Sequence, residues 1–163
     1  MSARPQKVPA AAGEELVLEI ERVFNAPRSL VYAAWTDPEH ATKWAPHNMQ
    51  IIYANAELRV GGKIRVGMRG ADGSEHWESG VYREIVPNEL LVFTHAWEDG
   101  NGGRGPETLV RVEFEDAGPG KTRMIFRQTG FASVASRDGH SQGWNESFDD
   151  LAAYFAKLQN KDA

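Results

Sequence analysis

Two segments that each begin with proline stand 11 positions apart near the start of the chain, after an alternating strand pattern. Pro27 and Pro38 suit the first position of a helix, where the backbone N–H has no intrahelical partner. Six more strand-like stretches follow, and one long amphipathic stretch closes the chain. This order constrains the fold strongly, because it describes a sheet wrapped around a C-terminal helix with an apolar hollow between them.

The strand predictions rest on alternating side chains and on the turn residues between them. In residues 15–24 three apolar residues, Leu16, Leu18 and Ile20, share one parity and the glutamates share the other, which indicates a half-buried strand. Short strands joined by turn signals indicate an antiparallel meander. Gly80 is predicted to form a β-bulge. The seven predicted strands cover residues 15–24, 49–54, 63–69, 75–86, 90–97, 108–115 and 122–130.

The hydrophobic period changes near the C-terminus. Five apolar residues recur there at spacings of 4, 3, 4 and 3, which places them on one face of a helix: Trp144, Phe148, Leu151, Phe155 and Leu158. We predict this helix over residues 137–158. The predicted fold class is therefore α+β, with a curved antiparallel sheet of about seven strands on a long C-terminal helix. Two short helices follow the first strand, and Asp37 is predicted to cap the second.

Length and composition limit the class of protein. A chain of 163 residues fits one domain, which we place at residues 14–160. Residues 1–13 lack the apolar run of a signal peptide and are predicted to form a disordered leader. No run of about 18 apolar residues occurs, so we predict no membrane insertion. The chain has no cysteine, which excludes disulfides and thiolate chemistry and is compatible with the cytoplasmic location that we expect.

Charge argues against one class of partner. The formal net charge is −5 at pH 7, and the cations alternate with carboxylates along the strands. Binding to nucleic acid requires a concentration of positive charge. We therefore predict that the chain has no nucleic-acid partner.

A series of short motifs in a fixed order supports a family resemblance. The motifs are 22–27 (RVFNAP), 34–39 (AWTDPE), Trp44, 60–63 (VGGK), 80–82 (GVY), 87–93 (PNELLVF) and 143–144 (GW). Through them, residues 15–158 resemble the helix-grip fold of the START-like (SRPBCC) superfamily. Within it they are most similar to bacterial relatives of the C-terminal domain of the heat-shock-chaperone ATPase activator. The resemblance implies a ligand cavity, as in many relatives, but the activities of these relatives differ.

Seven side chains are predicted to contact a ligand in the hollow. Residues of one strand parity share a sheet face, and tryptophans offer large flat apolar surfaces. Trp35 is assigned to the core, and ordinary core packing is the alternative for the other tryptophans as well. The predicted ligand-binding residues are Arg22, Trp77, Phe93, His95, Trp97, Trp144 and Phe148.

Two of these residues carry alternatives. A neutral His95 in the hollow would orient a ligand or act as a base, and otherwise it is a satisfied core or rim histidine. Arg22 would hold an anionic ligand head or pair internally with a carboxylate. Gly143 lowers helix stability by about 1 kcal/mol relative to alanine, which suggests close packing, ligand approach or a kink.

No catalytic constellation and no cofactor motif is evident. Residues 139–143 read G-x-S-x-G, but no histidine follows Ser141 as the hydrolase arrangement requires. The five histidines show no metal-ligand spacing, so we predict no metal site and no cofactor.

Three functions remain open. The first is binding of a small hydrophobic or aromatic molecule in the cavity between the sheet and the last helix. The second is an enzyme of cyclase, aromatase or hydratase type in the same cavity. The third, which rests on the resemblance alone, is an interaction protein similar to a chaperone ATPase activator. We expect a monomer or a homodimer.

Overall fold

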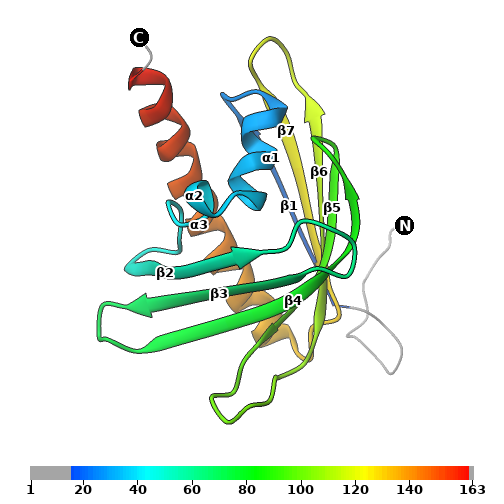
Figure 1. Ribbon diagram of the computed structural model, residues 1–163, viewed down its shortest axis with the longest axis vertical. Coiled ribbons are helices and arrows are strands. Elements are labelled where there is room, and N and C mark those ends of the chain that lie inside the picture. Colours follow the sequence, from blue (N-terminus) through cyan, green and yellow to red (C-terminus); the bar gives the residue numbers. More distant parts are fainter. Residues whose placement is uncertain (1–15, 162–163) are drawn as a thin grey trace.

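The computed structural model describes residues 16–161 as a seven-stranded antiparallel sheet with a long helix across its concave side (Figure 1). The strands are β1 (Val17–Phe24), β2 (Met49–Ala56), β3 (Lys63–Gly70), β4 (Glu75–Val86), β5 (Leu90–Trp97), β6 (Thr108–Asp116) and β7 (Thr122–Thr129). Their spatial order is β1-β7-β6-β5-β4-β3-β2. The predicted α+β helix-grip fold is confirmed, and the predicted bounds of β4 and β5 coincide with the observed ones.

Three helices complete the fold: α1 (Arg28–Thr36), α2 (Pro38–Ala41) and α3 (Val134–Lys161). The two short helices connect the edge strands β1 and β2. Asp37 caps α2 as predicted, because its carboxylate accepts a hydrogen bond from the Glu39 backbone N–H at 3.0 Å. Pro27 occupies the position before α1 and not the first helical position that we predicted.

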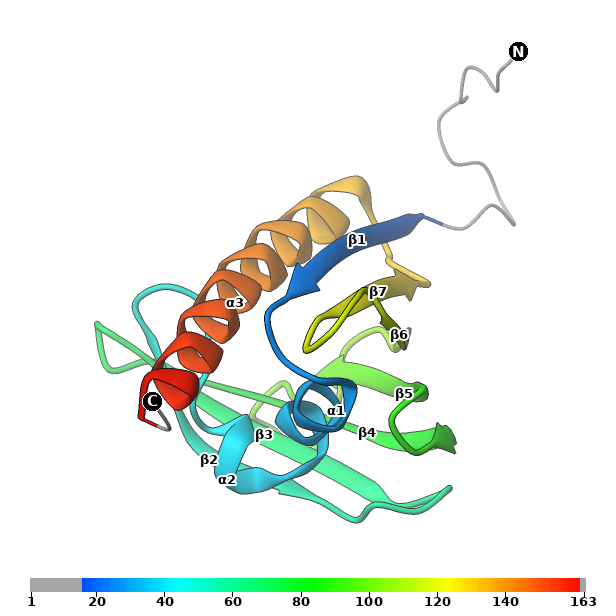
Figure 2. The same ribbon diagram turned by 90° about the horizontal axis from the view of Figure 1, so that it is seen from above.

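Figure 2 shows that the sheet curls from β1 round to β2, with α3 on the inner side and α1 and α2 closing one end. Irregular pairing accompanies this curvature, since a bulge bends its strand and increases the local twist. The register shifts between Ile51 and Tyr53 in β2, and between Tyr82 and Glu84 in β4.

The strand register does not shift at Gly80, so the prediction of a bulge at this residue was wrong. The glycine is required at that position for another reason. A Cβ atom on Gly80 would lie 1.7 Å from the Thr94 carbonyl oxygen, and no side chain fits there. The backbone of β5 approaches β4 closely at this point, which only glycine allows.

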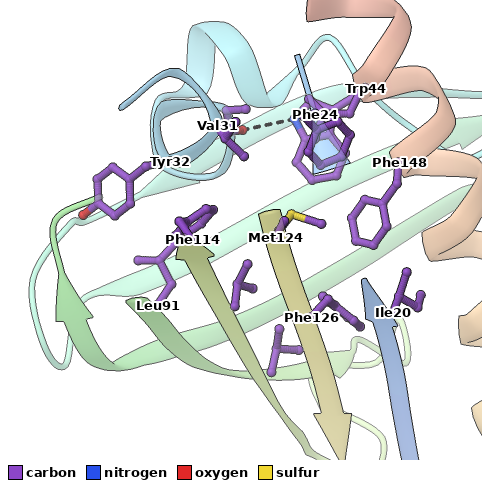
Figure 3. Close-up of a cluster of buried hydrophobic side chains, with 14 of the residues drawn as sticks. Ile20, Phe24, Val31, Tyr32, Trp44, Leu91, Phe114, Met124, Phe126 and Phe148 are labelled. Carbon is purple, nitrogen blue, oxygen red and sulfur yellow. Dashed lines mark hydrogen bonds between the residues drawn. The ribbon is translucent and has the colours of Figure 1, made fainter. Parts of the chain in front are cut away.

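The main core lies between the concave face of the sheet, α1 and the second half of α3 (Figure 3). Phe126 from β7 and Phe148 from α3 are completely buried, and their ring centroids lie 5.5 Å apart. Tyr32 of α1 meets Phe114 edge to face at 5.8 Å. Burial of each such side chain stabilises the fold by about 1.5–3 kcal/mol as an upper estimate.

Trp44 connects this core to the end of α1. Its indole N–H donates a hydrogen bond to the Ala34 carbonyl at 3.1 Å, drawn as the dashed line in Figure 3. No helix among residues 16–161 is both long enough and apolar enough to cross a bilayer. The predicted leader, residues 1–13, lies outside the described residues.

Candidate functional site

A partly enclosed cavity of about 390 Å³ lies between the first half of α3 and the concave face of β3, β4 and β5. Its volume falls in the range typical of small-molecule sites. Apolar side chains and glycine form most of the wall, and a few polar side chains interrupt them. The lining residues are Trp35, Ala41, Trp44, Pro46, Ile51, Ile64, Val66, Met68, Glu78, Tyr82, Leu91, Phe93, His95, Trp97, Ala135, Ser136, Gly139, His140, Gly143, Trp144 and Ser147.

Two glycines of α3 leave the space under the helix open. Gly139 and Gly143 are four residues apart, so they lie one turn apart on the same helix face. A Cβ atom on either of them would have no neighbouring atom within 4 Å. Close packing is therefore not the reason for Gly143. Both glycines line the cavity; Gly143 is half-buried and Gly139 is exposed.

Aromatic rings form one part of the cavity wall. Trp35 and Trp144 lie 5.6 Å apart between centroids, and Trp144 contacts the Phe126 ring at 4.8 Å. The Trp144 indole N–H donates to the side-chain oxygen of Gln128 at 2.9 Å, and Gln128 is fully buried. Gln128 in turn donates to the Thr108 hydroxyl at 2.8 Å. This buried network fixes the orientation of the Trp144 ring.

Polar side chains gather next to the aromatic wall, where the His95 ring lies 6.3 Å from that of Trp144 between centroids. His95 Nε2 lies 3.4 Å from Glu78 Oε1, and the His95 side chain is almost fully buried. The imidazole rings of His95 and His140 meet edge to face at 5.8 Å. The indole of Trp97 completes the group, with its ring 5.5 Å from that of His95.

The hydrogen bonds of His140 define its tautomer. His140 Nδ1 lies 2.7 Å from the Ser136 carbonyl oxygen, which only accepts, so Nδ1 carries the proton. The Trp97 indole N–H donates to His140 Nε2 at 3.0 Å, so Nε2 carries none. The ring is therefore neutral in this arrangement. Burial lowers the pKa of His140, and the hydrogen bond to Ser136 opposes this shift only in part.

Tyr82 adds a phenol to the wall from β4. Burial raises the pKa of Tyr82 to about 12, so the side chain stays a neutral phenol at physiological pH. Its ring meets that of Phe93 edge to face at 6.2 Å.

Four of the seven residues predicted from the sequence line the cavity: Phe93, His95, Trp97 and Trp144. Phe148 does not line it. It lies in the core behind Trp144, with the two ring centroids 5.7 Å apart. Its contribution to the cavity is therefore support of the Trp144 ring.

Arg22 is held by α3 outside the cavity wall. Its Nη2 atom lies 3.0 Å from Asp149 Oδ1 and 3.1 Å from both the backbone and side-chain oxygens of Asn145. Of the two alternatives for this residue, the structure has the internal pairing. A guanidinium bound in this way joins β1 to α3 and is not directed at a ligand head.

Trp77 also lies away from the cavity. It has the opposite strand parity from Glu78 and Tyr82, which line the cavity, so its ring lies on the other face of β4. There the Arg65 guanidinium lies over the Trp77 ring at 4.2 Å. The ring also covers Gly67, where a Cβ atom would lie 2.6 Å from it.

Several wall residues were not predicted from the sequence. Trp35 packs against the core, as predicted, and also lines the cavity. Glu78 and Tyr82 have the opposite strand parity from Trp77 in β4. They would have been predicted if that face, and not the face of Trp77, had been assigned to the cavity. Nothing in the sequence marks His140 or Ser136, because they depend on where α3 begins.

The described residues, 16–161, contain no group of three histidine, aspartate or glutamate side chains placed to hold a metal ion. They also place Ser141 inside α3, without the strand that a nucleophile elbow requires.

Comparisons with known proteins agree with this architecture. A protein from Chromobacterium violaceum is 26% identical, over 85% of this chain and 95% of its own, with a TM-score of 0.76. An uncharacterized protein from Rhizobium leguminosarum is 29% identical, over 88% of this chain and 96% of its own, with a TM-score of 0.74. The AHSA1 protein from Silicibacter pomeroyi is 24% identical, over 88% and 99%, with a TM-score of 0.79, and shares the fold.

No curated protein matches the sequence. The family model described as Activator of Hsp90 ATPase homolog 1-like protein matches residues 25–156, which is most of the chain. The match includes the short helices, strands β2 to β7 and the cavity-lining half of α3. The chain therefore belongs to the Activator of Hsp90 ATPase homolog 1-like family, within the START-like superfamily.

Proposed function

We propose that this protein binds a small hydrophobic or aromatic molecule in the cavity between the sheet and α3. The single observation that carries the proposal is the cavity lined by Gly139 and Gly143 on α3 and by a wall of aromatic rings. A cavity of about 390 Å³ with such a wall accommodates a molecule of one or two fused rings. Apolar pockets with a few placed polar groups are the usual sites for ligands of this kind.

The geometry also supports the proposal through what surrounds the space. The core on the far side of Trp144 is closely packed, with Phe126 and Phe148 fully buried. The hollow is thus confined to one half of α3 and is not a general looseness of packing. Displacement of water from an apolar wall by a ring contributes about 25 cal/mol per Å² of apolar surface buried.

Titration with naphthol tests the proposal directly. We expect naphthol to change the tryptophan fluorescence in a saturable way and to raise the melting temperature, because a ligand bound only by the native state stabilises it. The matched variants are Gly143→Leu, which places a side chain in the cavity, and Ala152→Leu, which places the same side chain on the exposed face of α3. Gly143→Leu should abolish saturable binding, and Ala152→Leu should retain it.

Absence of saturable binding to the wild-type protein, across naphthol and a set of ring compounds of similar size, would overturn the proposal. Equal binding by wild type and a folded Gly143→Leu variant would also overturn it, because the ligand would then lie elsewhere.

An enzyme that acts in the same cavity is the second candidate. The pair of His95 and Glu78 favours it, because a carboxylate next to an imidazole orients the ring and supports proton transfer. The test is to isolate any molecule that co-purifies with the protein and incubate it with fresh protein. Conversion by wild type and not by His95→Gln supports an enzyme, and recovery of the unchanged molecule supports a carrier.

The family description names an activator of the Hsp90 ATPase. A chaperone partner for this chain stays a prediction that rests on that likeness alone. Its test is the chaperone ATPase rate with increasing amounts of this protein.

A further inference from the structure

The polar groups around His95 in the cavity wall differ in their capacity to bind a ligand. Both nitrogens of His140 are occupied, one by the Ser136 carbonyl and the other by the Trp97 indole. The only donor of the Trp97 side chain is occupied by the same contact. Neither His140 nor Trp97 therefore has a polar atom left for a ligand in this arrangement.

Glu78 retains capacity to accept. A carboxylate has lone-pair sites for about four hydrogen bonds. In the part of the chain that the structure describes, the only ion-pair partner of Glu78 is His95 Nε2, at 3.4 Å from Oε1. The Glu78 side chain is only 18% exposed and lines the cavity. A carboxylate so placed favours a hydrogen-bond donor that enters the cavity.

The charge of the cavity wall also favours a ligand that donates a hydrogen bond over an anionic one. Among residues 16–161, no lysine or arginine lines the cavity. Arg22, which we considered from the sequence as the holder of an anionic head, lies outside the wall and is paired with Asp149. His95 already lies against Glu78. A second carboxylate near Glu78 would add like-charge repulsion in a partly desolvated site.

We infer that the cavity selects apolar ring compounds that carry a hydroxyl or amino donor, and that it discriminates against carboxylates such as aryl acids and fatty acids. The donor binds the carboxylate of Glu78, and the ring lies against Trp144 and Phe93. The inference rests on the proposed function, since it assigns the polar group of the ligand for the same cavity. It assigns Glu78 the role of the specificity-determining residue.

Three probes with one ring system separate the possibilities: naphthol, naphthylmethylamine and naphthoate. They share the apolar surface and differ in the polar group, which is neutral, cationic or anionic at neutral pH. Calorimetric titration should give dissociation constants for the first two that are at least about tenfold lower than for naphthoate. Naphthoate binding as tightly as naphthol would overturn the inference and leave the proposed function intact. Failure of all three probes to bind would instead overturn the proposed function.

A variant series assigns the selectivity to one carboxylate. Glu78→Gln retains the shape and removes the charge, so the amine-to-acid preference should fall by about tenfold or more. Glu84→Gln is the matched control, because Glu84 lies on the same strand and is exposed. It should keep the wild-type preference. A folded Glu78→Gln protein with the wild-type preference would overturn the role of Glu78, and melting curves establish that each variant is folded.

Discussion

The two halves of α3 perform different tasks although they form one continuous helix. In the second half, Phe148, Leu151 and Phe155 are buried in the core, with at most 1% of their surface exposed. In the first half, Gly139 and Gly143 have no neighbouring atom within 4 Å of an added Cβ. The second half thus anchors the helix, while the first half extends over a hollow that its own side chains leave open.

This difference teaches how a small domain keeps an open cavity without losing its fold. The apolar contacts that hold α3 on the sheet are concentrated in one part of the helix. Arg22 adds polar contacts where the two halves of α3 meet, through Asn145 and Asp149. Because these contacts fix the position of α3, the cavity-lining half needs no dense packing of its own.

The largest expected effect is in the anchoring half. Phe155→Ala removes a buried ring that packs edge to face on Phe24, with centroids 5.4 Å apart. The free energy of unfolding should fall by about 3–5 kcal/mol, measured by chemical denaturation. The folded fraction should still bind naphthol. A loss below about 1 kcal/mol would contradict the division between the two halves.

In the cavity-lining half we expect substitutions that raise the free energy of unfolding. In the double variant Gly139→Ala and Gly143→Ala, each methyl group enters open space, and alanine is a better helix former than glycine. Each substitution should raise the free energy of unfolding by about 0.5–1 kcal/mol. Naphthol should bind less tightly, because the methyl group at half-buried Gly143 narrows the cavity. Destabilisation of the apo protein would show that the space is not open.

A smaller effect is expected from Arg22→Met. The variant removes the ion pair with Asp149, whose side chain is more than half exposed, so the loss of stability should be about 0.5–1 kcal/mol. The affinity for naphthol should not change, because Arg22 belongs to the anchoring contacts. Loss of naphthol binding by a fully folded variant would show that Arg22 contributes to ligand binding after all.

The smallest effect concerns pH and the first half of α3. Burial lowers the pKa of His140 in the folded protein, while the unfolded chain has the ordinary histidine value of about 6.5. The unfolded chain therefore binds this proton first, and the contribution of His140 to stability declines as the pH falls below about 6.5. His140→Gln should reduce the loss of melting temperature between neutral and mildly acidic pH. A steeper loss in the variant would contradict the assigned neutral state.

The sequence predicts those parts of the fold in which apolar side chains recur at a fixed spacing. The alternation in β3 and β6 and the spacing of Trp144, Phe148 and Leu151 reflect faces that are buried, and burial selects apolar residues at a fixed period. The first turns of α3 lack such a period because they face a hollow. For this reason the predicted helix begins three residues too late, at 137 and not at Val134.

The candidate site is less predictable because it depends on contacts between distant residues. Strand parity identifies Phe93, His95 and Trp97 correctly as wall residues, since β5 is regular there. It does not reveal the partners of Arg22, because Asn145 lies 123 residues later in the chain. The residue type alone also does not show on which face of β4 Trp77 lies, because a tryptophan packs on either face of a sheet.

The five tryptophans provide the most direct test of the proposed site, because each gives a separate indole N–H signal in a proton–nitrogen correlation spectrum. Trp35, Trp44, Trp97 and Trp144 line the cavity, and Trp77 lies on the other face of β4 as an internal control. Saturating naphthol should shift the signals of Trp97 and Trp144 most and leave that of Trp77 in place. A spectrum in which only Trp77 moves, or in which no indole signal moves, would contradict ligand binding in this cavity.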